Sequence, residues 1–277
     1  MKTKKLIVSL LFLIIITNLL TSCEPTKAQD NKASNISTEI EVDEKPFSYF
    51  IEDGTKVMTR FNTPEGYKRT DSPEGSFGKY LQNLPLKPHG SVARHFDGTE
   101  KMNSSAYCAV VDLPLKGNPN HQCADAVMRL RAEYLFSEKR YGEIEFLYVS
   151  GNKSNYLSYL GGRTPTTNNL WSYMCGVFQS ANTYSLNKQM KSKDKNELEI
   201  GDVFIIGGFP GHVVIVVDKC VNNEGNVKFM LAQSYMPAQD IHILVGDDGQ
   251  SPWYDLDFGD YLFSAEYTFS KDQMKTF

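Results

Sequence analysis

The sequence predicts an α+β fold with an antiparallel sheet. Two apolar runs, 203–206 and 213–217, are separated by the turn 207–211, Gly-Gly-Phe-Pro-Gly, which is the pattern of two paired, buried strands. The stretch 123–136 instead contains helix-forming residues throughout, with acidic and basic side chains four residues apart. The 277 residues are 41% hydrophobic, enough to bury one substantial core or two small ones.

Residues 1–22 have the organisation of an export signal. Three lysines precede the apolar segment 6–20, which is shorter than the roughly 20 residues of a membrane-spanning helix. The sequence Leu-Thr-Ser-Cys at 20–23 follows and resembles a bacterial lipobox. The resemblance implies cleavage before Cys23 and acylation of its thiol, which would anchor the protein to a lipid bilayer of the bacterial cell envelope.

The rest of the chain is predicted to consist of a tether and one domain. Residues 23–45 are polar apart from a few isolated aliphatic residues, which is typical of a flexible lipid tether, and residues 46–277 are predicted to form a single α+β domain. The formal net charge is −4, and removal of the three lysines of residues 1–22 makes it −7. Binding to nucleic acid, or to anionic lipid through charge, is therefore not expected.

Shorter patterns predict the other elements of this domain. Helices are expected at 76–84 and 170–181, where aromatic and aliphatic residues recur at helical spacing. A loop is expected at 151–168, which is rich in Gly, Asn, Thr and Ser. Strands are expected at the short apolar runs 49–51, 57–61, 106–112, 143–150, 227–235 and 261–269.

Cys123 is a candidate nucleophile because it falls in the first turn of the predicted helix. Free backbone N–H groups and the positive end of the helix dipole stabilise a thiolate there and are expected to lower the pKa of the thiol. The same amides can bind an oxyanion. The alternative is a packing role, since Cys123, Val127, Leu130 and Tyr134 share one helical face and most cysteines are small buried hydrophobes.

His212 stands at the start of the strand 213–217, where a buried imidazole needs a partner. If Cys220 pairs with Val227 across the intervening turn, Val214 faces Gln233. Gln233 then lies diagonally from His212 on the same face of the sheet. A slip of one residue would present the neighbouring serine instead, because register decides the face.

The cysteines leave the redox state open. Besides Cys23 the chain contains Cys108, Cys123, Cys175 and Cys220, and an even number in an exported protein permits two disulfides. No CxxC or histidine-rich spacing suggests a metal site, and no cofactor is expected.

The order of these elements resembles that of papain-like cysteine hydrolases. A helix that starts with a cysteine is followed by strands led by Gly-Asp-Val at 201–203 and Gly-His-Val-Val-Ile-Val at 211–216, and then by a polar residue on the next strand. These blocks are similar to those of NlpC-type and CHAP-type cell-wall amidases. The resemblance implies a papain-like core with an antiparallel sheet, a nucleophile helix, and N-terminal and mid-chain additions.

The resemblance also implies roles for three residues. Cys123 would be the nucleophile, His212 the general base and then acid, and Gln233 the group that orients the imidazole. The expected substrate is a peptide or a peptidoglycan amide bond.

This sequence departs from those amidases in two respects. Gln122 precedes the cysteine, where an acidic residue is usual, and Ala124 and Asp125 follow it in place of small residues. The spacing from the cysteine to the histidine is long, so that residues 151–186 would be the mid-chain addition. A noncatalytic envelope binding module is therefore the alternative, with Trp253 and its neighbour Tyr254 expected at the surface. A purely structural lipoprotein is a third interpretation.

A second resemblance covers nearly the whole mature domain. The blocks QCADAVMRLRAEYLF at 122–136, GDVFIIGGFPGHVVIVVD at 201–218 and LAQSYMPAQDIHIL at 231–244 are similar to those of a bacterial lipoprotein family, domain of unknown function 4846. This resemblance supplies a family and no reaction.

Overall fold

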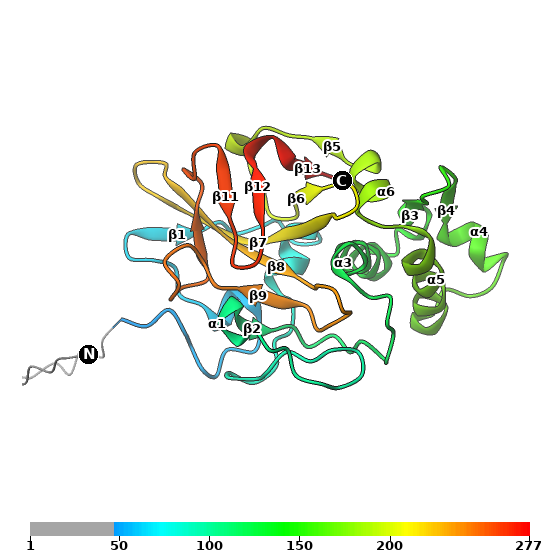
Figure 1. Ribbon diagram of the computed structural model, residues 1–277, viewed down its shortest axis with the longest axis horizontal. Coiled ribbons are helices and arrows are strands. Elements are labelled where there is room, and N and C mark those ends of the chain that lie inside the picture. Colours follow the sequence, from blue (N-terminus) through cyan, green and yellow to red (C-terminus); the bar gives the residue numbers. More distant parts are fainter. Residues whose placement is uncertain (1–46) are drawn as a thin grey trace, which may run out of the picture. The chain divides into compact units, whose positions relative to one another are not determined.

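The computed structural model describes residues 47–277 (Figure 1). The predicted signal peptide, the lipidation residue Cys23 and the tether 23–45 lie outside this range. The described residues combine one main antiparallel sheet with several helices, which confirms the predicted α+β class. Within 47–277, no helix has both the length and the apolar character needed to cross a bilayer.

The long strand β7 (His212–Asn222) lies near the centre of the sheet (Figure 1). Every pairing in the sheet is antiparallel. Two further strands, β1 (Tyr67–Arg69) and β10 (Trp253–Asp255), pair with β7 and β8 respectively. The main order of strands is β2 (Tyr107–Val110), β9 (His242–Leu244), β8 (Val227–Gln233), β7, β6 (Val203–Ile206), β13 (Met274–Thr276) and β5 (Lys191–Ser192).

Both faces of the central strands are covered. Val213 and Ile215 pack into the larger core, which they share with the helices, whereas Val214 and Val216 point to the opposite face. There they join Phe204 and residues of a hairpin made of β11 (Tyr261–Phe263) and β12 (Thr268–Ser270). Because successive side chains alternate between faces, a strand buried on both sides needs the uninterrupted apolar run seen in β7.

Helix α3 (Cys123–Ser137) packs against β7 and begins at the residue predicted from the sequence. The backbone N–H of Gln122 donates to the Asp125 carboxylate at 2.9 Å, which closes the first turn. Helix α5 (Thr167–Ser180) packs on α3, so that α5 and α4 (Tyr156–Leu160) lie beyond α3 as seen from the sheet (Figure 1). Two shorter helices, α2 (Phe77–Gln82) and α6 (Thr183–Gln189), also contact α3.

The predicted strand 49–51 is reduced to an isolated bridge between Phe50 and Phe61. Two other predicted elements are also wrong. The segment predicted as a strand at 57–61 begins with a short helix, α1 (Val57–Arg60), because the Thr59 hydroxyl accepts from the Lys56 amide and caps a turn. The predicted loop 151–168 contains β4 (Lys153–Asn155) and α4, whose first turn is capped by the Asn155 side chain. In both cases a local side-chain cap outweighs the composition of the segment.

Two predicted strands are shorter or divided. The segment 143–150 keeps only β3 (Glu145–Leu147), which follows a 3-10 turn at Tyr141–Glu143. The predicted strand 261–269 is instead the β11–β12 hairpin, because Ser264 and Tyr267 hydrogen-bond to each other and reverse the chain.

A β-bulge changes the register between β7 and β8, so that the predicted pairing is wrong at the turn and right at the other end. Val221, not Cys220, pairs with Val227, so the predicted pairing at the turn is wrong by one residue. The register shifts between Val216 and Asp218, and beyond this bulge Ile215 pairs with Ala232. The ends of the two strands that carry His212 and Gln233 therefore have the register that was predicted.

Replacement of Phe204 tests the packing between the sheet and the β11–β12 hairpin. Phe204 is fully buried and its ring lies 6.0 Å from that of Phe229 and 6.2 Å from that of Phe269. We expect Phe204→Ala to lower the free energy of unfolding by about 3–5 kcal/mol in guanidinium titrations. Phe263→Ala, in the same hairpin but 70% exposed, should change it by less than about 0.5 kcal/mol. Equal losses would contradict this assignment of the core.

Candidate functional site

The structure brings His212 and Gln233 together. His212 is the first residue of β7 and Gln233 the last of β8, and both side chains are buried. The imidazole Nε2 lies 2.7 Å from the Gln233 amide oxygen Oε1. An amide oxygen only accepts, so Nε2 carries the proton and donates it. Nδ1 is then the nitrogen of the neutral ring that has a lone pair and can act as a base.

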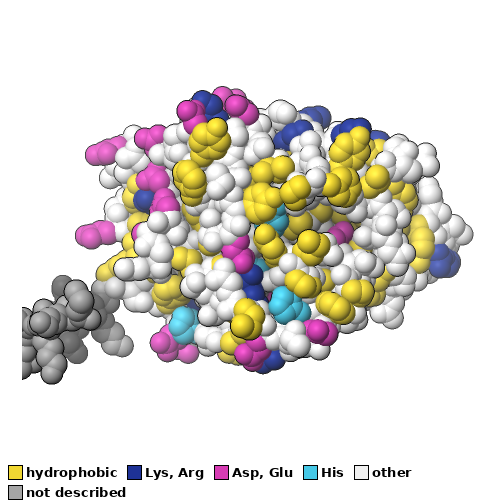
Figure 2. All heavy atoms as spheres, viewed as in Figure 1, with side chains coloured by type: hydrophobic (Ala, Val, Ile, Leu, Met, Phe, Trp, Pro, Cys, Tyr) yellow, Lys and Arg dark blue, Asp and Glu magenta, His cyan; other side chains and the backbone are white. Residues whose placement is uncertain are grey.

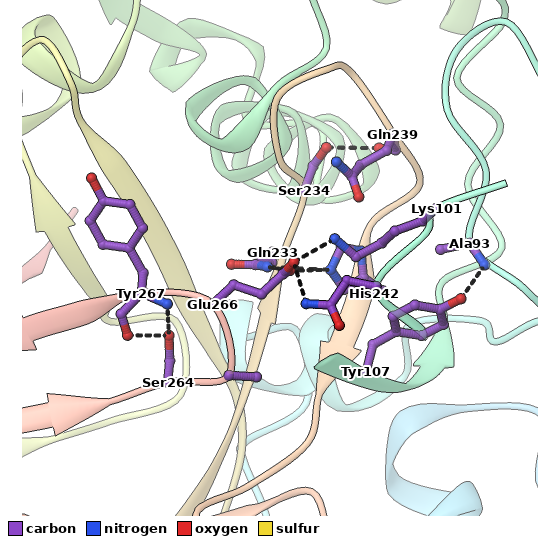
Figure 3. A network of polar contacts seen from close by, with 12 residues as sticks. Ala93, Lys101, Tyr107, Gln233, Ser234, Gln239, His242, Ser264, Glu266 and Tyr267 are labelled. Carbon is purple, nitrogen blue, oxygen red and sulfur yellow. Dashed lines mark hydrogen bonds and ion pairs between the residues drawn. The ribbon is translucent and has the colours of Figure 1, made fainter. Parts of the chain in front are cut away.

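The orientation of the Gln233 amide is set by its nitrogen. Nε2 donates to Glu266 Oε2 at 2.6 Å and lies 3.3 Å from Nε2 of His242 (Figure 3). The other nitrogen of His242, Nδ1, lies 2.8 Å from the Asp240 carbonyl oxygen, so it donates there and leaves Nε2 as an acceptor. Both amide protons of Gln233 are used, and this directs Oε1 towards His212.

Glu266 is held by a buried ion pair. Lys101 Nζ lies 2.7 Å from Glu266 Oε1 (Figure 3). The side-chain amide of Asn103 donates to the same oxygen at 3.1 Å. Burial alone would raise the pKa of Glu266, but the ion pair with Lys101 and the hydrogen bond from Asn103 outweigh burial and hold the pKa below its usual range. Glu266 is therefore an ionised acceptor for Gln233 at physiological pH.

Three aromatic rings enclose the imidazole of His212. The ring centroids of Tyr235 and Tyr267 each lie 4.7 Å from that of His212, and that of Phe269 lies 6.1 Å away. Burial lowers the pKa of His212 to about 4, although the hydrogen bond with Gln233 opposes this shift. The ring is thus neutral at pH 7 and held between Tyr235 and Tyr267.

Cys123 lies at the start of α3 and is half-buried. The backbone amides of Ala124 and Val213 lie close to its sulfur and act to lower the pKa of the thiol, so the thiol lies beside the residue that follows His212. Burial, followed by the charge of Asp125, raises the pKa of Cys123 to about 11 and outweighs these amides. The expectation of a lowered thiol pKa is therefore wrong: the helix amides act in the predicted direction, but desolvation is larger.

The Cys123 thiol lies near the strand that begins with His212 but is not hydrogen-bonded to the imidazole. Among residues 47–277, none of the side-chain hydrogen bonds joins Cys123 Sγ to the His212 ring. The structure thus brings two of the three predicted residues into contact and places the third next to the backbone of the same strand.

Cys123 opens into a pocket of about 260 Å³. The pocket is formed by residues 122–125, the start of α6, the turn 208–211 and Met236. Its rim is apolar, with Phe209 79% and Met236 68% exposed. In Figure 2, hydrophobic side chains gather in the middle of the viewed face, whereas acidic ones gather towards the end away from α5.

Asp125 is the ionisable carboxylate of this pocket. Its Oδ2 accepts from the Gln122 amide, but its buried Oδ1 has no hydrogen-bond partner within 47–277. Burial raises the pKa of Asp125 to about 8. A protonated Asp125 is a hydrogen-bond donor next to the thiol.

The other residues considered in the sequence lie outside the group formed by Cys123, His212 and Gln233. Cys108, Cys175 and Cys220 are free thiols like Cys123. Within 47–277, no group of three or more His, Cys, Asp or Glu side chains is arranged to hold a metal ion. The expected exposure of Trp253 and Tyr254 is wrong, since each is only 1% exposed and both pack in the interior.

Sequence reasoning missed the residues that support His212 and Gln233. Lys101 and Glu266 are far apart in the chain, and neither lies in a recognisable motif. Tyr235 follows Gln233 by two residues, and residues two apart on an extended chain point to the same face. This spacing could have predicted that Tyr235 lies near His212. Tyr267 had no such signal, because its position depends on the hairpin.

The comparisons identify the family of the chain. A family model described as "Domain of unknown function (4846)", DUF4846, matches residues 57–276. The chain belongs to this family. The comparison with curated proteins found no match, and neither did the comparison with solved structures.

Removal of the buried ion pair tests how the network stabilises the site. The side chains of Lys101 and Glu266 are only 6% and 11% exposed. We expect Lys101→Met to lower the free energy of unfolding by about 3–5 kcal/mol, because it leaves the Glu266 carboxylate buried without a cation. In denaturant titrations, the double variant Lys101→Met with Glu266→Gln should lose clearly less free energy of unfolding than the two single variants lose in sum.

The matched control for this cycle is Lys153, whose pair with Glu145 is 64% and 40% exposed. Lys153→Met should change the free energy of unfolding by less than about 1 kcal/mol. Strict additivity of Lys101→Met and Glu266→Gln would show that the two side chains do not act as a pair.

The buried imidazole predicts a dependence of stability on pH. The pKa of His212 is about 4 in the folded protein and about 6.5 in an unfolded chain, so the unfolded state binds the proton more tightly between these values. The free energy of unfolding should therefore fall as the pH is lowered from about 7 to 4. His212→Gln removes this contribution. Between pH 7 and 4 we therefore expect the free energy of unfolding of this variant to fall by about 3 kcal/mol less than that of the wild type. Parallel curves for both proteins would contradict the buried neutral state.

Proposed function

We propose that this member of the DUF4846 family is a lipid-anchored cysteine hydrolase of the bacterial cell envelope. It has a papain-like core and cuts peptide or amide bonds, with peptidoglycan as the substrate class. One observation carries the proposal: the 2.7 Å contact between His212 Nε2 and Gln233 Oε1, at the strand ends beside the pocket that contains Cys123. Gln233 is oriented by Glu266, which is the arrangement needed to hold an imidazole in one tautomer.

The reaction follows from the protonation states. In the proposed mechanism, Nδ1 of the neutral His212 takes the proton of the Cys123 thiol as the sulfur attacks the carbonyl carbon of the substrate. The C–N bond breaks, and the imidazolium returns the proton to the leaving amine. The acyl group stays on Cys123 as a thioester. His212 then removes a proton from water, the resulting hydroxide attacks the thioester, and the carboxylic acid and the thiol are released.

The resting thiol and imidazole are both neutral at pH 7, since their pKa values are about 11 and 4. Proton transfer therefore accompanies the attack, as with a serine nucleophile, and no thiolate–imidazolium pair exists beforehand. The proposed mechanism requires the sulfur to come within hydrogen-bond reach of the ring when substrate binds. Catalytic hydrogen bonds are commonly longer without substrate and tighten when substrate binds.

The oxyanion of the intermediate would be stabilised by the start of α3. Its first-turn amides have no partners within the helix, and the Ala124 amide lies close to the sulfur. Together with the positive end of the helix dipole, these groups offer donors at the place where negative charge develops.

The proposed anchor is the acylated Cys23. Residues 23–45 would act as the tether, and 23 residues span at most about 80 Å when fully extended. A tether of this length gives the domain access to polymeric material some distance from the bilayer. This supports an insoluble envelope substrate such as peptidoglycan.

A second candidate function is a noncatalytic envelope module that binds a peptide or glycan. The raised pKa of Cys123 and the lack of a direct hydrogen bond from its thiol to His212 within the described residues favour it. The apolar rim formed by Phe209 and Met236 suits binding as well as catalysis.

The hydrolase proposal is tested by replacing the nucleophile. We expect Cys123→Ala to reduce the cleavage of peptidoglycan fragments, followed by mass spectrometry of the released muropeptides, by at least about 10³-fold. Cys175→Ala is the matched control, because Cys175 is also a half-buried free thiol on a helix, and it should retain activity. Iodoacetamide should modify Cys123 in the folded wild type with parallel loss of activity. Cleavage that persists in Cys123→Ala would exclude this nucleophile, and fragment binding without cleavage by the wild type would favour the binding module.

A further inference from the structure

A second pocket lies between α3 and α5, with a volume of about 320 Å³. Side chains of α2, α3 and α5 line it, and none of them lines the pocket of Cys123. Its volume is within the range of small-molecule sites. The proposed hydrolase does not use it.

The pocket combines an apolar wall with two cations. Phe136, Leu170 and Met174 contribute the wall, together with the indole of Trp171. Lys116 Nζ lies 4.7 Å from the centroid of the Trp171 ring, and the guanidinium carbon of Arg129 lies 5.0 Å from it. Two cations thus lie at one aromatic ring, and an anionic group placed near them would be attracted to both.

The charges of the pocket do not cancel. Glu133 accepts from Arg129 Nε at 2.7 Å and from the Tyr80 hydroxyl at 3.3 Å, so its carboxylate is already neutralised. Lys116 makes no ion pair within residues 47–277. The net charge of the pocket is thus positive, in a chain whose overall charge is negative.

One terminal nitrogen of Arg129 is available to donate a hydrogen bond to a ligand. Its side chain is only 4% exposed. Its Nε donates to Glu133, and one terminal nitrogen donates to the Pro114 carbonyl oxygen at 3.1 Å. The second terminal nitrogen has no hydrogen-bond partner within the part of the chain that the structure describes. Thr167, the first residue of α5, also lines the pocket, so the positive end of a 14-residue helix faces the same space.

We propose that this pocket binds a small carboxylate with a flat apolar body. The apolar body packs on Trp171 between Phe136 and Met174, and the carboxylate lies between Lys116 and the free terminal nitrogen of Arg129. A neutral ligand of the same shape would leave the Lys116 ammonium without an anionic partner, and a cationic ligand would be repelled. The site is independent of Cys123, and its occupation requires no hydrolase activity.

The experiment uses the purified full-length protein in detergent and two probes of nearly equal shape, 3-phenylpropionate and 3-phenylpropanamide. The chain contains two tryptophans, and Trp253 is buried with its indole N–H bonded to the Asn62 carbonyl. A change in fluorescence on titration therefore reports on Trp171, and isothermal calorimetry gives the dissociation constant. We expect saturable binding of the carboxylate, with the amide at least about tenfold weaker, because it lacks the charge-assisted hydrogen bonds.

Variants assign the binding to this pocket. Lys116→Gln should weaken the binding of 3-phenylpropionate about threefold, as expected for an exposed charge. Lys139→Gln is the matched control, because Lys139 is also exposed, does not line the pocket and has a φ of 58°, close to the 52° of Lys116. It should bind like the wild type. Arg129→Gln should weaken binding more than Lys116→Gln, and Cys123→Ala should not change it.

Equal affinity for the acid and the amide, no saturable binding of the acid, or equal effects of Lys116→Gln and Lys139→Gln would each overturn the proposal. If Arg129→Gln does not fold, the two probes and the two lysine variants still decide the question. Binding of 3-phenylpropionate by a protein that cuts no peptidoglycan would uphold this pocket while the hydrolase proposal fails.

Discussion

The position of the Gln233 amide is the constraint on which the candidate site depends. An amide can be rotated by half a turn with little change in shape, and the reversed group would present two donors to His212 in place of an acceptor. The ionised Glu266, held by Lys101, makes the reversed state unfavourable because its own acceptor oxygens would then face the amide oxygen. A buried ion pair contributes little to stability on balance, but it can select one orientation of a neutral group. That selection fixes the tautomer of His212.

The sheet supplies the rigid surroundings that this selection needs. His212, Gln233 and His242 lie at the ends of three neighbouring strands, and the alternation of side chains puts all three on the face covered by the β11–β12 hairpin. Cys123 approaches from the other side, on a helix that packs against the opposite face. The two halves of the site thus belong to different layers and meet at the edge of the sheet. The thiol contacts the backbone of β7 there, next to Val213.

Local patterns predicted the elements that carry the candidate residues, and they failed where a contact between distant segments decides the structure. The start of α3 at Cys123 and the strand 203–206 follow from composition, turn residues and periodicity. The bulge between Val216 and Asp218 has no signature in the sequence, yet it restores the register at the site. The pKa of Cys123 depends on how much protein covers the sulfur, a quantity that a helix-start pattern does not contain. Glu266 is invisible to local patterns for the same reason, because its partners come from segments 33 and 165 residues away.

The hairpin that contributes Glu266 and Tyr267 also sets an order of assembly. The strand ends that carry His212 and Gln233 can pair as soon as β7 and β8 have been made, but the imidazole is not enclosed and the amide is not oriented until residues 261–270 have followed them. Until then, the thiol and the histidine are present without the groups that align them. Completion of the site is thereby coupled to completion of the domain, so a partly synthesised chain lacks the oriented amide and the enclosed imidazole.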